Sequence, residues 1–238
     1  MIGCDCPVCR SDDPRDWRTR TSAIVEENGA TLLIDTAPEL RLQSIAVGLK
    51  RIDAVLYTHA HADHVDGFDD LRRFNQINQA KLDVHCDAET AGLLRTRYSY
   101  AFEFPFPFFG GKPDLELRVF DGCFDAAGIA VQPFQVSHGR WTVNGFRMGG
   151  LVYLTDAKEI PQTSLDVMRG ADVLVINALR DEPHPVHLSL GQALDIIAEV
   201  KPKRAYLVHV SHELPHAATS RRLPENVFMA YDGLVVDV

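Results

Sequence analysis

The sequence lacks any hydrophobic run long enough to cross a membrane. A membrane-spanning helix needs about 18 or more apolar residues in a row, and no stretch of the 238 residues comes near that length. The first residues, from Met1 to Cys4, also lack the basic, apolar and small-residue regions of a secretory signal peptide. We therefore expect a cytoplasmic protein with no membrane partner.

Basic residues are in the minority. The 24 Lys and Arg residues against 33 Asp and Glu residues give a formal net charge of -9. Affinity for a long polyanion comes mainly from basic side chains that displace counterions. The composition therefore disfavours a nucleic acid as partner and favours a small molecule, and it leaves a homodimer open.

Cysteines are few, and their spacing excludes a disulfide framework. There are five, an odd number, and three of them are crowded into Cys4, Cys6 and Cys9. That spacing is too tight for disulfide bonds but suits a metal ion. Cys86 and Cys123 lie in or beside apolar strand patterns, where a free cysteine usually behaves as a small core residue.

The pattern of apolar residues predicts one domain over 1–238 of mixed α/β class, since 46% of the residues are hydrophobic. Asn28-Gly29 between apolar runs at 22–27 and 31–35 predicts a β-hairpin. We expect helices at 38–48, 64–75, 88–99, 163–169 and 189–200, and strands at 53–57, 82–86, 116–120, 128–136, 151–155, 173–177, 205–210 and 234–238. Alternating Phe and Pro at 102–109 predict a loop, either packed on the core or forming an apolar wall of the site. The mixture indicates a layered α/β sandwich.

The segment from Thr58 to His64 follows an apolar strand and contains three imidazoles and a carboxylate: His59, His61, Asp63 and His64. Residues two apart share a face of an extended chain, so that His59 and His61 would bind one ion. Asp63 and His64 would reach a second ion after the chain turns. Imidazole and carboxylate ligands suit zinc, manganese or iron, and a site without thiolate keeps open positions for water and substrate. The segment therefore predicts a catalytic metal site.

The spacing His-Ala-His-Ala-Asp-His resembles the H-x-H-x-D-H signature of the metallo-β-lactamase superfamily. The resemblance covers the chain from about residue 18 onward and implies a four-layer αββα sandwich. It also implies that His59, His61 and His138 hold one metal ion and that Asp63, His64 and His209 hold the other. Asp156 would bridge the two ions, and Asp35 would support the ligands from behind.

Two ions held in this way suit hydrolysis. A bridging water loses its proton near neutral pH, while the ions polarise the scissile group and neutralise the charge that develops in the transition state. The metal-bridging hydroxide makes a protein nucleophile unnecessary. Asp63 is therefore expected to be catalytic as a metal ligand.

The cysteine cluster narrows the choice of hydrolase. Three thiolates in a C-x-C-x-x-C spacing lack one partner for a closed tetrahedral zinc site, and His212 is the candidate for it. The arrangement resembles the phosphoribosyl cyclic phosphodiesterase branch of the carbon-phosphorus lyase pathway. That resemblance implies a structural zinc beside two catalytic zinc or manganese ions. It also implies that His187, in His187-Leu188-Ser189-Leu190, is a general acid or a phosphate-stabilising group.

One departure from that branch concerns the N-terminus. Members of the phosphoribosyl cyclic phosphodiesterase branch begin with a strand and a glycine-rich loop before the cysteines. This sequence starts at Met1, almost directly before Cys4. We therefore expect either a late recorded start or a missing first strand. A missing first strand would alter one wall of the pocket. It would therefore affect which substrate is bound more than it affects metal binding.

The sequence thus predicts a binuclear metal-dependent hydrolase, a phosphodiesterase acting on small, cyclic phosphate esters. One alternative is a hydrolase of a carbon ester, thioester or lactone, which needs the same hydroxide. Another is a non-catalytic metal-dependent binding module. A phosphate-binding environment would favour the phosphodiesterase, and Arg72, Arg73 and Arg140, next to the ligand segments, are candidates for it.

Overall fold

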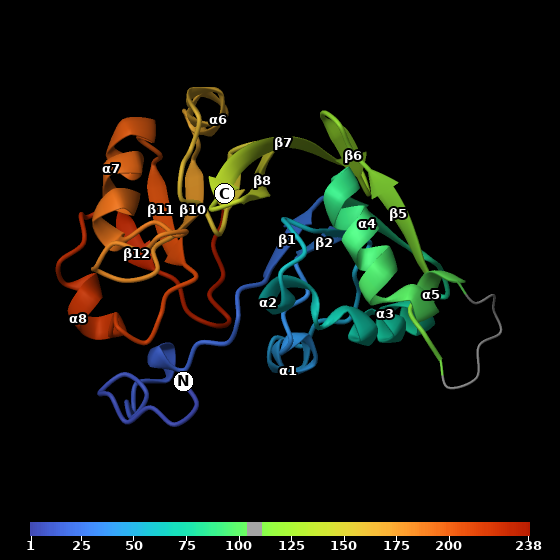
Figure 1. The fold of residues 1–238 in the computed structure, drawn as a ribbon, viewed down its shortest axis with the longest axis horizontal. Helices are drawn as coiled ribbons and strands as arrows, with labels where there is room; N and C mark the ends of the chain where they lie inside the picture. The colour runs from blue at the N-terminus through green and yellow to red at the C-terminus, as the bar shows by residue number, and fades with distance from the viewer. Residues whose placement is uncertain (104–110) are drawn as a thin grey trace. The chain divides into compact units, whose positions relative to one another are not determined.

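The computed structural model describes residues 1–103 and 111–238, which fall into two compact units. Unit 1 consists of Met1–Thr19 and Pro133–Val238, and unit 2 of Arg20–Gln132. Each has its own helices, sheet strands and apolar core (Figure 1). A single domain over 1–238 stays a prediction. Residues 104–109 of the predicted Phe-Pro loop lie outside the described residues, and the loop expected at 102–103 is wrong, because these two residues end helix α5 (Ser99–Glu103) ahead of the first proline.

Unit 2 opens with the predicted hairpin. Strands β1 (Ala23–Glu27) and β2 (Ala30–Ile34) pair antiparallel. Asn28 and Gly29 have φ angles of 52° and 81°, as both central residues of a type I′ turn require. From β2 onward the neighbours are parallel, in the order β2, β3 (Ala54–Leu56), β4 (Leu82–Cys86) and β5 (Leu115–Val119). The carboxyl ends of these strands therefore share one edge of the sheet.

The core of unit 2 lies between these strands and helices α1 (Leu40–Ala46), α3 (Leu71–Asn78), α4 (Ala88–Arg97) and α5 (Ser99–Glu103). Asp87 caps α4 by accepting a hydrogen bond of 2.7 Å from the backbone N–H of Thr90. The predicted single helix at 64–75 is wrong. The chain instead forms α2 (Ala62–Val65), a 3-10 turn (Phe68–Asp70) and then α3.

Gly67 explains why that helix is broken. Its N–H donates to the carbonyl of Thr36 at 2.9 Å, and a Cβ atom there would lie 2.2 Å from the carbonyl oxygen of Ala37. The chain must pass directly against this backbone, which only glycine permits. The close approach ties the segment that carries the histidines to the residues that follow β2.

Unit 1 is built on a second sheet. Strand β8 (Trp141–Met148) is antiparallel to β9 (Leu151–Leu154), and β9, β10 (Val173–Asn177), β11 (Arg204–Val208) and β12 (Val227–Met229) follow in parallel. Strand β7 (Ile129–His138) begins in unit 2, where it pairs with β6 (Phe124–Ala126), and ends in unit 1. The strand predicted at 234–238 is wrong, because that segment has no regular structure and the last strand is β12.

Three helices complete unit 1: α6 (Gln162–Met168), α7 (Leu190–Val200) and α8 (His216–Ser220), with a 3-10 turn at Pro14–Asp16. The predicted helix at 189–200 is confirmed in α7. Ser189 and Gln192 form a reciprocal capping box at its start. Its apolar face, with Leu190, Ala193 and Ile197, is buried in the core of unit 1. No helix in the described parts of the chain has the length and apolar character to cross a membrane.

Gly145 shows why β8 escaped prediction. Asn144-Gly145 is a turn signal in the sequence, yet both residues lie within the strand. A Cβ atom on Gly145 would lie 2.3 Å from Cζ of Phe134 on β7. The glycine therefore accommodates an aromatic ring on the sheet surface rather than a turn.

We predict that Gly145→Ala lowers the free energy of unfolding by about 1–3 kcal/mol, because the added methyl group overpacks against Phe134. Gly92→Ala is the control: Gly92 is exposed in α4, with no atom near its Cβ position. That change should raise the free energy by about 0.5–1 kcal/mol. Urea unfolding measures both, and a Gly145→Ala protein as stable as the parent would contradict the packing described.

Candidate metal centre

Unit 2 places its predicted ligands where β3 ends. Thr58 and His59 follow β3, while His61 precedes α2 and His64 lies within it. The ring centroid of His59 is 4.5 Å from that of His61 and 4.4 Å from that of His64. Asp63 joins them, with its Oδ2 atom 3.4 Å from Nε2 of His64. The structure therefore brings the four predicted ligands of this segment together.

Asp35, at the carboxyl end of the neighbouring β2, orients two of these imidazoles. Its Oδ2 atom lies 2.8 Å from Nδ1 of His64 and accepts the hydroxyl hydrogen of Thr58 at 2.8 Å. The Thr58 hydroxyl in turn lies 3.0 Å from Nδ1 of His59. With Nδ1 protonated on both rings, the lone pairs are on Nε2, the atom that would bind an ion. The predicted supporting role of Asp35 thus has a specific hydrogen-bonding geometry.

The Asp35 side chain is fully buried, together with His64. Burial raises the pKa of the carboxyl group, while the adjacent imidazole and the two hydrogen bonds from Thr58 act in the opposite direction. A buried carboxylate is stable only when its oxygens are hydrogen-bonded, and both oxygens of Asp35 are.

Arg97 is a residue of this region that sequence reasoning missed. It lies in the last turn of α4, and its guanidinium donates to the carbonyl of Ala60, between His59 and His61, at 3.2 Å. It also lies 3.4 Å from the carboxylate of Asp66. Arg97 therefore supports the backbone of the histidine segment. No local motif marks it, because it comes from a distant helix.

Unit 1 brings together the other predicted residues. His138 ends β7, Asp156 follows β9, His209 follows β11, and His187 lies in the loop before α7. Oδ1 of Asp156 is 3.2 Å from both Nδ1 of His187 and Nε2 of His209. The ring of His187 lies 4.5 Å from that of His138 and 4.9 Å from that of His209, measured between centroids.

Hydrogen bonds from behind fix two members of this cluster. Nδ1 of His138 lies 2.7 Å from the carbonyl oxygen of Val186, so that its proton is on Nδ1 and its lone pair on Nε2. The hydroxyl of Thr155 donates to Oδ2 of Asp156 at 2.8 Å, which turns Oδ1 toward the imidazoles. The same design therefore operates in both units.

The possible metal-ligand atoms of this cluster in unit 1 lie close enough together to bind one cation. Ring nitrogens of His138 and His187 and an oxygen of Asp156 lie within 4.8 Å of one another. Nδ1 of His187 is buried, and although it is 3.2 Å from Asp156, no hydrogen bond to the described residues is aligned with it. Two imidazole nitrogens and a carboxylate oxygen within this distance of one another are a ligand set that suits a zinc or manganese ion.

His187 is neutral in this arrangement. Burial is the largest cause that lowers its pKa, and with the neighbouring histidines it outweighs Asp156 and brings the pKa to about 3. A neutral imidazole is the form that binds a cation or donates one hydrogen bond. His187 thus lies beside Asp156, a predicted metal ligand. That His187 itself does not bind a metal ion stays a prediction.

Three residues of these clusters have left-handed backbone conformations. The φ angles are 60° for Asp35, 53° for Asp156 and 52° for His209, and each residue stands just past a strand end. Non-glycine residues in this region cost energy and gather at functional sites. The turn redirects each side chain at the carboxyl edge of its parallel sheet, where ligands of such sheets bind.

Cys4, Cys6, Cys9 and His212 form a separate cluster within unit 1, and their ligand atoms lie within 4.8 Å of one another. Nδ1 of His212 is 3.5 Å from Sγ of Cys4 and 3.3 Å from Sγ of Cys6. The hydrogen bond from His212, then that from the backbone N–H of Cys9, lowers the pKa of Cys6 to about 6. Three thiols and an imidazole at this spacing fit tetrahedral zinc.

The three arginines proposed for phosphate binding have other partners. Arg72 donates to Asp69 at 2.8 Å, and Arg73 donates to Gln76 at 3.1 Å, each within its own helical segment. The guanidinium of Arg140 lies over the ring of its neighbour Trp141, 5.3 Å from the centroid. These contacts give no support to a phosphate-binding role for any of the three.

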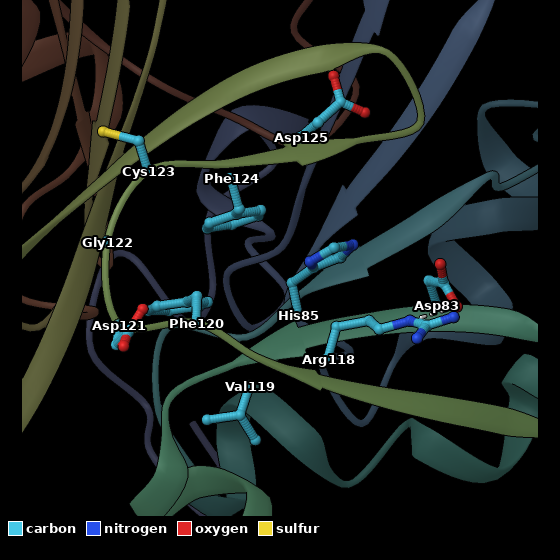
Figure 2. A pocket seen from close by; sticks show the side chains of 10 residues that line it. All are labelled: Asp83, His85, Arg118, Val119, Phe120, Asp121, Gly122, Cys123, Phe124 and Asp125. Atoms are coloured by element: carbon cyan, nitrogen blue, oxygen red, sulfur yellow. Dashed lines mark hydrogen bonds and ion pairs between the residues drawn. The ribbon is translucent and has the colours of Figure 1, made fainter.

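A hollow of about 310 Å³ in unit 2 contains none of the predicted ligands. It lies over the ends of β4 and β5 and the turn into β6, where Figure 2 shows the Asp83 to Arg118 ion pair and the rings of His85, Phe120 and Phe124. Phe124 stacks on both other rings, with centroids 4.7 Å and 4.9 Å apart. The aromatic faces are thus packed on each other, and the candidate site remains with the histidine clusters.

Comparison with known proteins agrees with this geometry. Residues 30–210 match the family model described as the beta-lactamase superfamily domain. The chain therefore belongs to the metallo-β-lactamase superfamily. The predicted fold class and enzyme class, a metal-dependent hydrolase of this superfamily, are confirmed, and the family implies divalent metal ions.

The chain is also similar to a crystal structure of a diphosphatase from the PhnP family, with 38% identity and a TM-score of 0.92, over 100% of this chain and 91% of that one. This confirms the predicted branch. Zinc-bound PqqB from Methylobacterium extorquens shares the fold, at 20% identity and a TM-score of 0.76, over 100% of this chain and 95% of that one. An octanoyltransferase of Porphyromonas gingivalis is 37% identical over 98% of this chain. The chain spans about half of that relative's length, 48%.

We predict that Asp35→Asn lowers manganese affinity roughly 10- to 100-fold, because His64 and Thr58 lose the charged acceptor that orients them. Manganese is the probe because thiolates prefer zinc. Asp53→Asn is the matched control, since Asp53 accepts the N–H of Thr31 and pairs with Arg51 in the same unit without touching a histidine. Calorimetric titration measures both, and equal affinities for Asp35→Asn and the parent would contradict the orienting role.

We predict that iodoacetamide at pH 7 modifies Cys6 of zinc-free protein long before Cys86. The pKa of Cys6 is about 6, whereas burial is the main cause that raises the pKa of Cys86 to about 12, and the thiolate is the reactive form. Added zinc should protect Cys4, Cys6 and Cys9 but not Cys123, an exposed thiol outside the cluster. Mass spectrometry of the peptides reads the result, and cysteines left unprotected by zinc would exclude the site.

Proposed function

We propose that this chain is a binuclear metal-dependent phosphodiesterase that cleaves small phosphate esters, cyclic ones among them. One observation carries the proposal. In each unit, imidazoles whose Nδ1 atoms are held from behind converge beside a carboxylate: His59 and His64 with Asp63, and His138 with Asp156. Oriented imidazoles next to carboxylates are the ligand set of hydrolytic zinc and manganese sites.

We assign the ligands by the family's order: His59, His61 and His138 hold one ion, Asp63, His64 and His209 hold the other, and Asp156 bridges them. When bound, a pair of zinc or manganese ions supplies an activated water and neutralises charge on the phosphate. Asp35 and Thr58 keep the imidazoles of unit 2 in the correct tautomer, and the carbonyl of Val186 does the same for His138. The cluster of Cys4, Cys6, Cys9 and His212 holds a third, structural zinc.

His187 acts on the substrate in this proposal. Its ring centroid lies 4.5 Å from that of His138 and 4.9 Å from that of His209, where the neutral imidazole would donate a hydrogen bond to a non-bridging phosphate oxygen. The imidazole lies beside Asp156, with its buried Nδ1 atom 3.2 Å from Oδ1 of that residue, and this confined position limits its motion.

A second candidate is hydrolysis of a thioester, and the similarity to an octanoyltransferase favours it. That relative is about twice as long, so its named activity describes a larger protein. An activated water can attack a thioester carbonyl as well as a phosphate, and the same metal ligands would serve both reactions. The substrate therefore decides between the two functions.

The test is a comparison of substrates with metal-stripped protein reloaded with zinc or manganese. We expect hydrolysis of bis(4-nitrophenyl) phosphate and of a 2′,3′-cyclic nucleotide, complete loss with chelator, and at most weak hydrolysis of an octanoyl thioester. Asp63→Ala should lower turnover by roughly a thousandfold or more with the circular dichroism spectrum unchanged. Full activity in metal-free protein, or a preference for the thioester, would overturn the proposal.

We predict that His187→Ala lowers turnover of the cyclic nucleotide by about 10²–10³-fold with metal content unchanged, because the phosphate loses the hydrogen bond from the imidazole. Nitrophenyl esters should lose less, because their good leaving group makes turnover depend less on that hydrogen bond. Elemental analysis of the same preparation separates the roles: a lost metal ion would make His187 a ligand, and an unchanged rate toward the cyclic nucleotide would remove it from the mechanism.

A further inference from the structure

Asn177 is a buried polar residue at the carboxyl edge of the parallel strands in unit 1, and the proposed function gives it no role. It is the last residue of β10, and its side chain is fully buried. Strand β10 lies between β9, which leads to Asp156, and β11, which leads to His209. Asn177 therefore belongs to the strand flanked by those that carry two of the proposed metal ligands.

The side-chain amide of Asn177 holds the backbone next to Asp156. Its Oδ1 atom accepts the backbone N–H of Ala157 at 2.8 Å, and both residues are fully buried. Ala157 directly follows Asp156, whose left-handed backbone has a φ angle of 53°. A non-glycine residue keeps such a conformation only where its surroundings hold it. The hydrogen bond from Ala157 to Asn177 restrains the chain one residue beyond the carboxylate.

Ala157 also contacts the loop that carries His187. Its carbonyl accepts the backbone N–H of Leu188 at 2.8 Å, and Leu188 directly follows His187. Oδ1 of Asp156 lies 3.2 Å from Nδ1 of His187. The position of Ala157 therefore affects the backbone beside Asp156 and the backbone beside His187 together, and Asn177 holds Ala157 in place.

The other polar atom of the Asn177 amide, Nδ2, is buried and makes no hydrogen bond to the described residues. A buried donor without an acceptor is unfavourable, whereas a buried hydrogen bond that is made is favourable. The contribution of Asn177 therefore comes from Oδ1. A substitution that keeps an oxygen at that position loses no hydrogen bond to the described residues.

We propose that Asn177 is a positioning residue for the metal centre, which acts through Ala157 to hold Asp156 as a bridging ligand and His187 beside the phosphate. This inference rests on the proposed function of the histidine clusters. Groups that orient a metal ligand from behind typically change metal affinity by about 10–100-fold when they are replaced. A small displacement of a group that contacts the substrate lowers turnover as well.

The experiment replaces Asn177 in the whole chain, stripped of metal and titrated with manganese. Asn177→Leu removes the acceptor at similar size, and Asn177→Ala removes it without crowding if the leucine variant does not fold. We expect manganese to bind about tenfold more weakly by calorimetric titration. The electron paramagnetic resonance signal of two coupled manganese ions should give way to that of separate ions, because Asp156 no longer bridges them.

Asn177→Asp is the conservative variant, since it keeps an oxygen that accepts the N–H of Ala157 and lacks only Nδ2. It should retain the coupled signal. Ser164→Ala is the matched control: Ser164 is buried in unit 1 and donates to the carbonyl of Gln135 at 2.6 Å. This control loses a hydrogen bond that involves none of the proposed ligands, so that thermal stability should fall while manganese binding stays the same.

Parent-like manganese affinity and a coupled signal in the leucine and alanine variants would overturn the positioning role. An Asn177→Asp protein that loses as much as Asn177→Leu would overturn it too. The parent protein tests the proposed function separately. Two coupled ions in the parent without hydrolysis of the cyclic nucleotide would remove the proposed phosphodiesterase, while the manganese titrations would still test Asn177. A parent that binds no pair of ions would remove both.

Discussion

The hydrogen bonds to the buried carboxylate of Asp35 are the constraint on which the metal-binding segment depends. One oxygen, Oδ2, accepts hydrogen bonds from Nδ1 of His64 and from the hydroxyl of Thr58. The same hydroxyl lies within hydrogen-bond distance of Nδ1 of His59. The other oxygen accepts the backbone N–H of Thr58 at 2.9 Å. A single carboxylate thereby sets the tautomer and direction of two imidazoles and the start of the loop that carries them. Burying a carboxylate alone is costly, and the three hydrogen bonds that Asp35 accepts offset the cost.

The parallel sheets determine where such carboxylates and imidazoles stand. Asp35 and His59 lie just past neighbouring strands β2 and β3, and Asp156 and His209 lie just past β9 and β11. Left-handed backbone at Asp35, Asp156 and His209 turns the chain sharply at these ends. The strands and their apolar cores hold these conformations in place. The stability of each sheet therefore offsets the energy cost of the left-handed residues at its edge.

Much of the site follows from the sequence because its chemistry is local. The histidine segment and the cysteine cluster each have all or most of their members within a few residues, and the structure brings each together. The order of strands and ligands in a known superfamily supplied His138, Asp156 and His209. Elements with strong local signals, such as the hairpin at Asn28-Gly29 and helix α7, agree with the structure for the same reason.

What the sequence did not predict depends on contacts between distant residues. Strand β8 accepts a turn-like Asn-Gly pair because the ring of Phe134 packs on Gly145. The helix expected at 64–75 breaks because Gly67 passes against Ala37. Arg97 supports the histidine segment from the end of another helix. None of these contacts has a signature in the neighbouring residues.

We propose that the histidines of both clusters together hold one pair of catalytic ions, while the cysteines and His212 hold a third ion. Anomalous X-ray diffraction from crystals loaded with manganese and zinc, recorded at the absorption edge of each metal, tests it most directly. We expect two ions about 3.5–4 Å apart, with histidines of both clusters as ligands, and a separate zinc on Cys4, Cys6, Cys9 and His212. A single ion at the histidines, or metal bound at the cysteines alone, would contradict it.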